Sequence, residues 1–294
     1  YLYVHPVIGK EVAMYKRILS AVNEHLNSEI TARYALNLAR ACGARLYLCF
    51  VAEKGLSDAD IEKTEDSMKR LFSGARDMDV QVESISTTGQ PLQEIKKVVR
   101  EENIDLVFVS ARRVDVERRF YRATTAREIL LKLPCSVALT RVVHMGRVHP
   151  GKILVPLKAR IDNVPERAYF TAKMAEGFNS RVFVFHAPKP ITGFFHGEIE
   201  LTPVEWEKRM PVDIRDFMGH ITKYRIDFEG RLLPGRVART ITIEAAAKRH
   251  GLIIMGAAGR SLLSSLLRGN PVERVLRETP CDLIILKPGH KDDK

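Results

Sequence analysis

The sequence predicts an α/β protein made of two tandem, open, parallel five-stranded sheets, each with helices on both faces. Two observations carry this prediction. The chain of 294 residues repeats itself with a period near half its length. Within each repeat, short apolar runs alternate with amphipathic segments, which is typical of strands and helices in a sheet covered on both sides. At roughly 100–200 residues per domain, the length also favours two domains.

The repeat is visible as matched segments at two offsets. Residues 17–19 match residues 152–154 at an offset of 152 − 17 = 135, and residues 106–109 match residues 252–255 at 252 − 106 = 146. Two further matches share the later offset: Gly89 with Gly235, and Pro134-Cys135 with Pro280-Cys281. The second repeat therefore holds 146 − 135 = 11 extra residues. We expect this insertion in residues 188–200, which are rich in proline and glycine.

Each repeat predicts the same order of elements. The first domain (residues 14–143) is expected to have strands at 17–22, 45–51, 80–86, 105–110 and 135–139, and helices at 28–42, 58–77, 125–132 and from Pro91. A linker (144–151) leads to the second domain (152–288), with strands at 152–157, 181–186, 225–232, 252–256 and 282–286. Pro211 is expected to break or kink a charged helix that carries Trp206 and Met210. Because the chain begins with Tyr1, we expect the native start near Met14.

Composition places the chain among cytoplasmic globular proteins. It is 45% apolar and 28% charged, and no apolar run approaches the roughly 18 residues of a membrane span. The four cysteines lie in or beside apolar segments without a C-x-x-C pair, so we expect reduced core residues. The net charge of +11 is interpreted mainly as a solvated basic surface. His144 and His149 lie in the linker with no third ligand nearby in sequence, so we expect no metal site.

A glycine-rich segment after the fourth strand of the second domain carries the strongest chemical signal. It reads G-x2-G-x9-G, with glycines at 256, 259 and 269. Glycine at the end of a strand lets the backbone turn and lets a ligand approach closely. Asn270 and Pro271 then suit the cap and first position of a helix, whose free N–H groups favour a phosphate, and Arg260 could add a charged contact. A purely structural turn remains the alternative.

This segment, through Leu286, closely resembles the nucleotide loop and last strand of the universal stress protein family. The resemblance covers both halves, from about residue 14 to 288. It implies a Rossmann-like, adenine nucleotide alpha hydrolase-like fold, a pseudo-dimer of the two domains and, as a candidate assembly, a homodimer. It also implies ATP or AMP, with Mg²⁺ as a candidate companion. The nucleotide-binding residues that it implies are Pro156, Leu157, Lys158, His186, Ala187, Met255, Gly256, Gly259, Arg260, Gly269, Asn270, Pro271 and Val272.

Three positions depart from the family pattern. Members of the family usually have an acidic residue just after the first strand. This chain has Lys158 at that position in the second domain and Asn23 in the first. The family also usually has Ser or Thr after the third glycine, where this chain has Asn270. In the first domain the three glycines become Ser110, Arg113 and Ala123. Side chains therefore stand where backbone must approach phosphate, and we expect nucleotide in the second domain only.

The first domain instead has an arginine-rich loop. Its basic residues are Arg112, Arg113, Arg118, Arg119 and Arg122, with only two acidic residues among them. This loop is a candidate site for an anion, RNA or an acidic partner. An exposed basic loop without a ligand is the alternative, so nucleic acid stays an open possibility.

The sequence shows no strong catalytic motif. No Walker loop, G-x-S-x-G elbow or H-E-x-x-H is present. His186 ends a strand and is interpreted as a packed or capping histidine rather than a base. We expect no catalytic residue and at most weak ATP hydrolysis. The leading hypothesis is a regulatory stress-response protein that binds an adenine nucleotide, and the alternative is an interaction scaffold without a nucleotide.

Overall fold

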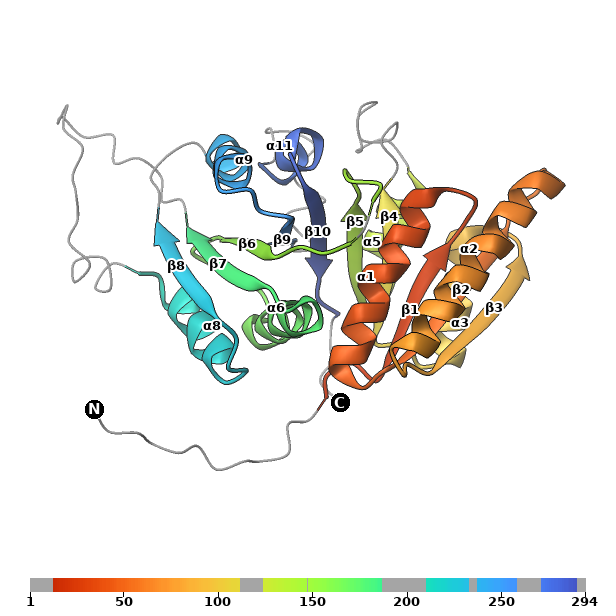
Figure 1. Cartoon of the computed structure of the whole chain (residues 1–294), viewed down its shortest axis with the longest axis horizontal. Coiled ribbons are helices and arrows are strands. Elements are labelled where there is room, and N and C mark those ends of the chain that lie inside the picture. The colour runs from red at the N-terminus through yellow and green to blue at the C-terminus, as the bar shows by residue number, and fades with distance from the viewer. Residues whose placement is uncertain are drawn as a thin grey trace.

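A computed structural model describes residues 13–111, 124–146, 148–186, 210–232, 237–257 and 271–289, without the side chains of residues 231 and 232. The first half contains β1 (Arg17–Val22), α1 (Leu26–Cys42), β2 (Arg45–Ala52), α2 (Asp58–Asp77), β3 (Val82–Thr88), α3 (Pro91–Glu101), β4 (Leu106–Ala111), α5 (Thr125–Lys132) and β5 (Ser136–Arg141). The second half contains β6 (Lys152–Leu157), α6 (Val164–Phe178), β7 (Arg181–His186), α8 (Val212–Thr222), β8 (Phe228–Leu232), α9 (Val237–Ala247), β9 (Leu252–Gly256), α11 (Pro271–Glu278) and β10 (Asp282–Lys287). Figure 1 shows the two halves side by side.

The predicted α/β fold is confirmed, and most expected elements lie within two residues of their observed bounds. Pro211 was expected to break or kink a helix, and helix α8 begins directly after Pro211, which occupies its N-cap position. Proline has no N–H and favours the start of a helix over its interior, so it sets the boundary here. Trp206 and the expected insertion at residues 188–200 lie outside the described residues.

The two halves form one continuous sheet. Its order is β3-β2-β1-β4-β5-β10-β9-β6-β7-β8. Neighbouring strands are parallel within each half, whereas β5 and β10 pair antiparallel through five residue pairs from Leu283↔Arg141 to Lys287↔Val137. The two expected five-stranded sheets are thus joined edge to edge. This junction covers one edge strand of each half, which would otherwise expose unpaired backbone groups.

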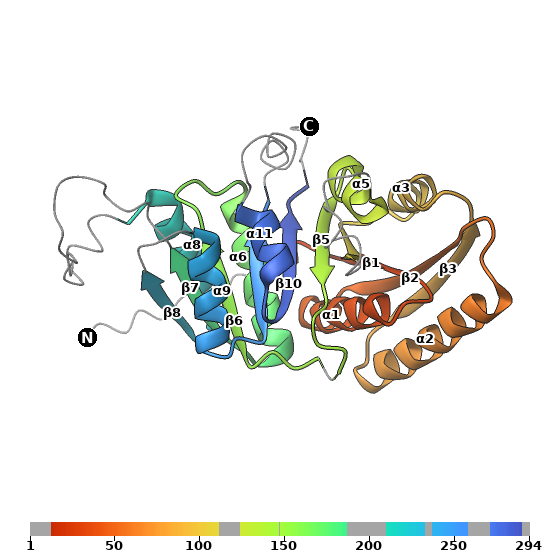
Figure 2. The ribbon, with the colours of Figure 1, turned by 90° about the horizontal axis from the view of Figure 1, so that it is seen from above.

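Two apolar cores lie on opposite faces of this sheet. One lies under α1, α2, α6 and α8, and includes Leu38, Leu71, Phe170 and Phe217. The other lies under α3, α5, α9 and α11, where buried aliphatic side chains dominate. Figure 2, seen from above, shows helices on both sides of the strands. Strands covered on both faces explain the nearly continuous apolar runs of the sequence.

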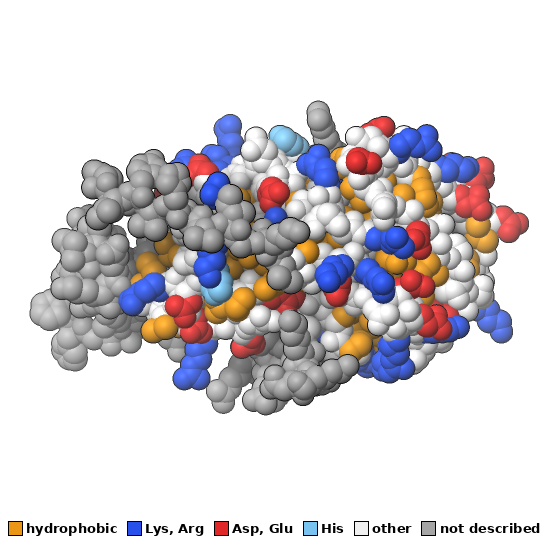
Figure 3. All heavy atoms as spheres, turned by 90° about the horizontal axis from the view of Figure 1, so that it is seen from below, with side chains coloured by type: hydrophobic (Ala, Val, Ile, Leu, Met, Phe, Trp, Pro, Cys, Tyr) orange, Lys and Arg blue, Asp and Glu red, His pale blue; other side chains and the backbone are white. Residues whose placement is uncertain are grey.

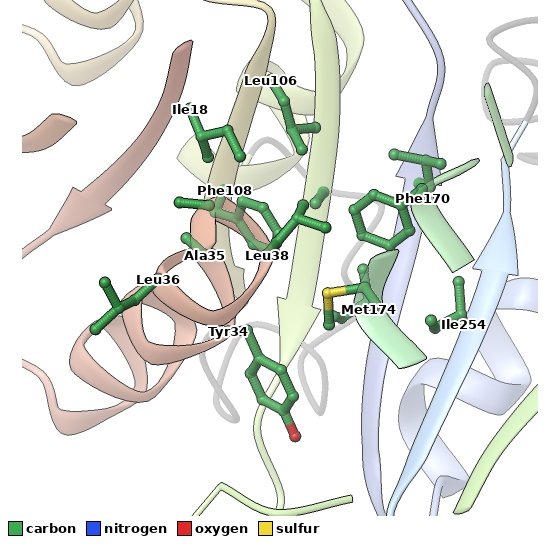
Figure 4. Close-up of a cluster of buried hydrophobic side chains, with 14 of the residues drawn as sticks. Ile18, Tyr34, Ala35, Leu36, Leu38, Leu106, Phe108, Phe170, Met174 and Ile254 are labelled. Carbon is green, nitrogen blue, oxygen red and sulfur yellow. The ribbon is translucent and has the colours of Figure 1, made fainter. Parts of the chain in front are cut away.

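The α1 and α6 face is packed across the junction of the halves. The rings of Phe108 and Phe170 stack with centroids 6.2 Å apart, and Tyr34 meets Phe178 edge to face at 5.4 Å. Figure 4 shows Leu38, Phe108, Phe170 and Met174, from the two halves, directed into one cluster. The first-half core is therefore continuous with the second-half core, and the halves stabilise each other.

Buried hydrogen bonds fix the same junction. The hydroxyl of Tyr34 donates to Oδ2 of Asp282 at 2.8 Å, and the backbone N–H groups of Val143 and His144 donate to its Oδ1 at 2.7 and 3.0 Å. On the other side, Glu166 accepts from Tyr15 at 2.9 Å and also from Ser136. Each buried carboxylate has several donors, as burial of a charged group requires.

The described surface mixes charges rather than collecting them. On the face shown in Figure 3, basic and acidic side chains lie interspersed, with apolar side chains between them.

All four cysteines lack a disulfide bond, as predicted, and burial raises the pKa of Cys49, Cys135 and Cys281 to about 12. Among the described residues no helix combines the length and apolar character needed to cross a bilayer.

The crossing of α1 and α6 is close because α6 carries Gly177 there. A β-carbon on Gly177 would lie 2.7 Å from the carbonyl oxygen of Asn37. Nη2 of Arg40 also donates to the Gly177 carbonyl at 2.5 Å. We predict that Gly177→Ala lowers the free energy of unfolding by about 1–3 kcal/mol, because the added methyl pushes the helices apart.

Gly219 in α8 provides the matched control for this variant. An added β-carbon there meets nothing within 4 Å. Gly219→Ala should leave stability unchanged or raise it by up to about 1 kcal/mol through helix propensity. Urea unfolding of both variants tests the contact, and equal midpoints for the two would contradict a tight crossing.

A buried carboxylate also ties α1 to α2. The Glu29 side chain is 1% exposed and accepts from Arg33 at 2.7 Å and from Nη2 of Arg70 at 2.8 Å. Burial by itself raises the pKa of Glu29, but hydrogen bonds from Arg70, Arg33 and Ser67 outweigh burial and hold the pKa below its ordinary value. The native state therefore binds fewer protons here than the unfolded chain does.

The lowered native pKa of Glu29 predicts a contribution to stability that is lost in acid. The contribution is complete above the ordinary value of 4.5 and is lost as the pH falls through the lowered native pKa. Glu29→Gln should lower unfolding free energy at pH 7 by about 1–3 kcal/mol, and should flatten its decline in acid. Thermal unfolding between pH 3 and 7 measures both, beside the exposed control Glu62→Gln. An unchanged acid slope for Glu29→Gln would refute the assignment.

Candidate functional site

The carboxyl ends of three neighbouring strands bring the described part of the predicted site together. Strand β6 lies between β9 and β7 in the sheet. Pro156 and Leu157 end β6 and Lys158 follows, His186 ends β7, and Met255-Gly256 end β9. Residues separated by about a hundred positions in sequence thus share one edge of the sheet. Ligands of open parallel sheets bind at this edge.

The pairing of β6 with β9 stops before this edge. These strands pair only at Ile153↔Leu252 and Leu154↔Ile253. In contrast, β6 and β7 stay paired to Leu157↔His186, and β9 and β10 stay paired to Gly256↔Leu286. Pro156 has no N–H to give to a ladder, in agreement with the early end. Chain connections leave β6 and β9 toward opposite sides, so their separation marks the topological switch point.

His186 is engaged by its neighbouring strand. Its Nδ1 lies 2.9 Å from the carbonyl oxygen of Leu157. This contact agrees with a capping role for the ring rather than that of a general base. The loop after Lys158 is held by α8, because the N–H of Ile161 donates to Oδ2 of Asp213 at 2.7 Å. The end of β6 and the loop that follows it are therefore held in place by contacts with β7 and α8.

The structure adds one residue that the sequence interpretation missed. Arg167 lies in the second turn of α6 and is 7% exposed. Its guanidinium packs directly on Gly256, so that a β-carbon on Gly256 would collide with Nη1. Glycine fits here because Arg167 occupies the space beside its α-carbon. The expected contact of Gly256 with a ligand stays a prediction.

The guanidinium is held entirely by backbone carbonyls. Nε donates to Asp162 at 2.6 Å, Nη1 to Leu286 at 3.3 Å, and Nη2 to Ala257 at 3.3 Å. Ala257 opens the segment after β9, and its own N–H donates to the Leu286 carbonyl at 2.9 Å. Arg167 thus connects the start of α6 with the carboxyl ends of β9 and β10.

The electrostatics of this corner are positive. Burial lowers the pKa of Arg167 to about 10, although the charges of Asp162 and Glu166 oppose this shift. The protein groups around Lys158 lower the pKa of its ammonium by removing water, and the charge of Arg167 lowers it further. Arg167 remains a cation near neutral pH, because its lowered pKa still lies well above 7. Lys158 is exposed at the end of β6.

The remaining predicted residues divide into two groups. Pro271 and Val272 begin α11, with Pro271 at the first helical position and Val272 buried in the core below. Ala187, Gly259, Arg260, Gly269 and Asn270 lie outside the described residues. The arginine-rich loop, with Arg112, Arg113, Arg118, Arg119 and Arg122, also lies outside them.

The first half has a different pair at the corresponding corner. The strand offset of 252 − 106 = 146 places Ser110 at the position of Gly256. The helix ends Gly43 and Asn179, both in left-handed conformation, give an offset of 179 − 43 = 136, which places Thr31 at the position of Arg167. A large side chain facing glycine is therefore replaced by two small hydroxyl residues. Thr31 is fully buried, and its Oγ1 has no partner among the described atoms.

This exchange is the signal by which Arg167 could have been found. Arg167 follows Glu166 near the start of α6, and its repeat partner Thr31 is small where the glycine at position 256 is matched by Ser110. The His144 ring lies 3.9 Å from Asp282, and no group of three metal-ligating side chains occurs in the described ranges.

Comparisons with known proteins agree with this architecture. The model of the Universal stress protein family matches residues 14–141 and 151–287. A universal stress protein of Methanocaldococcus jannaschii is 24% identical over 167 residues, which are 56% of this chain and 97% of that protein. A universal stress protein of Thermus aquaticus is 26% identical over 127 residues, which are 42% of this chain and 89% of that protein.

A solved structure shares the whole tandem arrangement. The crystal structure of a universal stress protein from Archaeoglobus fulgidus superposes with a TM-score of 0.63 at 16% identity, covering 95% of this chain and all of that chain. Because the family model covers both halves of the chain, this chain belongs to the Universal stress protein family.

Proposed function

We propose that this protein is a nucleotide-binding regulatory protein of the stress response, which holds ATP or AMP at the second half only. The observation that carries the proposal is the parting of β6 and β9 at their carboxyl ends, directly beside the glycine-rich segment. A nucleotide seated there would meet Pro156, Leu157 and Met255 on one side and the start of α11 on the other. The proposed ligand-binding unit is the second domain, residues 152–288.

Apolar and charged groups at this edge match the two parts of a nucleotide. Pro156 and Met255 are buried apolar residues at the strand ends, suited to the flat face of a base. Lys158 and Arg167 provide positive charge, suited to phosphate. Lys158 replaces the acidic residue expected from the family pattern, so we propose that it lies toward phosphate rather than toward adenine.

The site supports binding better than turnover. His186 is engaged by a strand carbonyl, and no group of three or more His, Cys, Asp or Glu side chains that could hold a metal ion occurs in the described part of the chain. Any ATP hydrolysis would therefore be slow, and the protein would act through its bound state. The four free cysteines support a reducing compartment such as the cytoplasm.

Nucleotide binding tests the proposal directly. Isothermal titration of the full chain with ATP and with AMP should show one site per chain. Gly259→Glu, which places a carboxylate in the glycine-rich segment, should weaken ATP binding at least 10-fold through repulsion of phosphate. Mass analysis of small molecules released from the denatured protein should identify a co-purified adenine nucleotide.

The repeat supplies a matched control at the same offset. Arg113 is the first-half counterpart of Gly259, since 259 − 146 = 113. Arg113→Glu should leave the ATP affinity within about twofold of the parent value. Equal loss in both variants, or full affinity in Gly259→Glu, would refute binding at the second half.

A further inference from the structure

Arg167 is a buried cation whose direct hydrogen-bond partners carry no charge. A charged guanidinium is 7% exposed, and its hydrogen bonds go to three neutral carbonyl oxygens. Burial of a cation is costly unless a counter-charge accompanies it. Carbonyl dipoles reduce this cost but do not neutralise the charge.

Neither nearby carboxylate is available as a direct partner. Glu166 is directed to other donors, because it accepts from Tyr15, Ser136 and Asn163. Asp162 contributes its backbone carbonyl to Arg167, and its carboxylate acts only over a distance. Within the described part of the chain, no carboxylate forms an ion pair with this guanidinium.

A second cation stands at the same corner. Lys158 follows β6 directly, and the repulsion between it and Arg167 lowers its proton affinity. Two cations that repel each other at a strand end are stabilised together by one shared anion. The sequence alone places Lys158 here, but only the packing of α6 on Gly256 brings the second charge to it.

The first half shows that the fold does not require this charge. At the positions that match Arg167 and Gly256 the first half has Thr31 and Ser110, and the strand order of that half is the same. Arg167 and Gly256 are therefore not a general packing solution for this fold. They are specific to the half that carries the glycine-rich segment.

We infer that Arg167 and Lys158 make the corner at Gly256 an anion site, which selects ligands by their phosphate charge and favours a nucleoside triphosphate over the monophosphate. The nucleoside part of this inference rests on the proposed function, whereas the anion site does not. A phosphate oxygen at the guanidinium would supply the missing counter-charge. Each added phosphate charge would then strengthen binding.

The experiment compares three probes: ATP, AMP and inorganic tripolyphosphate. The parent chain should bind ATP at least 10-fold more tightly than AMP and should also bind tripolyphosphate. Arg167→Gln keeps a polar side chain that can donate to the carbonyls but removes the charge. It should reduce the ATP to AMP preference toward one and abolish tripolyphosphate binding.

Two further variants keep the test valid. Arg40→Gln removes a different arginine that donates to a carbonyl in α6, and it should leave the ATP to AMP ratio unchanged. If Arg167→Gln fails to fold, Arg167→Thr combined with Gly256→Ser installs the first-half pair. This double variant has its volume compensated, and it should fold and show the same loss of preference. Circular dichroism melting verifies folding before each titration.

Each outcome separates this inference from the proposed function. An ATP to AMP ratio that is equal in the parent and in a folded Arg167 variant overturns the inference while ATP binding stands. Tripolyphosphate binding that depends on Arg167, in a chain that binds no ATP, supports the anion site and refutes the nucleotide. A parent chain that binds none of the three probes overturns both.

Discussion

The antiparallel pairing of β5 with β10 is the contact on which the rest of the molecule depends. It places the two halves back to back across one ladder, so that α1 and α6 must cross on the same face. Gly177 permits that crossing, and the stacked rings of Phe108 and Phe170 fill the space between the helices and the sheet. Because the pairing is antiparallel, the carboxyl edges of the two halves point in opposite directions along the junction. The carboxyl edge of each half is therefore separate from that of the other half.

Helix α6 connects this junction to the candidate site. Its Glu166 accepts from Tyr15 and Ser136 of the first half, and the next residue, Arg167, packs on Gly256 of the second half. The two side chains are adjacent in sequence and lie on neighbouring parts of one helix. The contact between the halves and the positive corner at β9 are therefore held by the same turn of α6. Residues 166 and 167 thus connect the contact between the halves with the carboxyl end of β9.

The two halves have diverged by exchange of size and charge at matching places. In the second half a guanidinium packs on a glycine, and the matching positions of the first half hold a threonine and a serine. In the first half, polar groups of the loop after β1 form hydrogen bonds with one another. The N–H of His25 donates to Oδ1 of Asn23 at 3.1 Å, and Ser28 donates to the Asn23 carbonyl. In the second half, Lys158 at the end of β6 remains near another cation instead. The first half thus has hydrogen-bonded polar groups after its first strand, whereas the second half has two neighbouring cations there.

The sequence by itself determined the repeat, the alternation of strands and helices, and the position of the glycine-rich segment. These features depend on local periodicity and on residues such as Pro91, Pro271 and Gly256, whose backbone preferences act over a few positions. The family resemblance also depended on them. Local pattern could not show which edges of the two sheets meet, because strands β5 and β10 are both apolar and both could be central or edge strands.

Only the tertiary structure decided which residue lies beside Gly256. From the sequence it was interpreted as bare backbone for a ligand, since a glycine at a strand end has that meaning in isolation. The chain path of α6 places Arg167 beside it from 89 positions away (256 − 167 = 89), and no periodicity encodes such a meeting. Long-range packing chose the neighbour of the glycine, and the burial of that neighbour's charge gave the corner its chemistry.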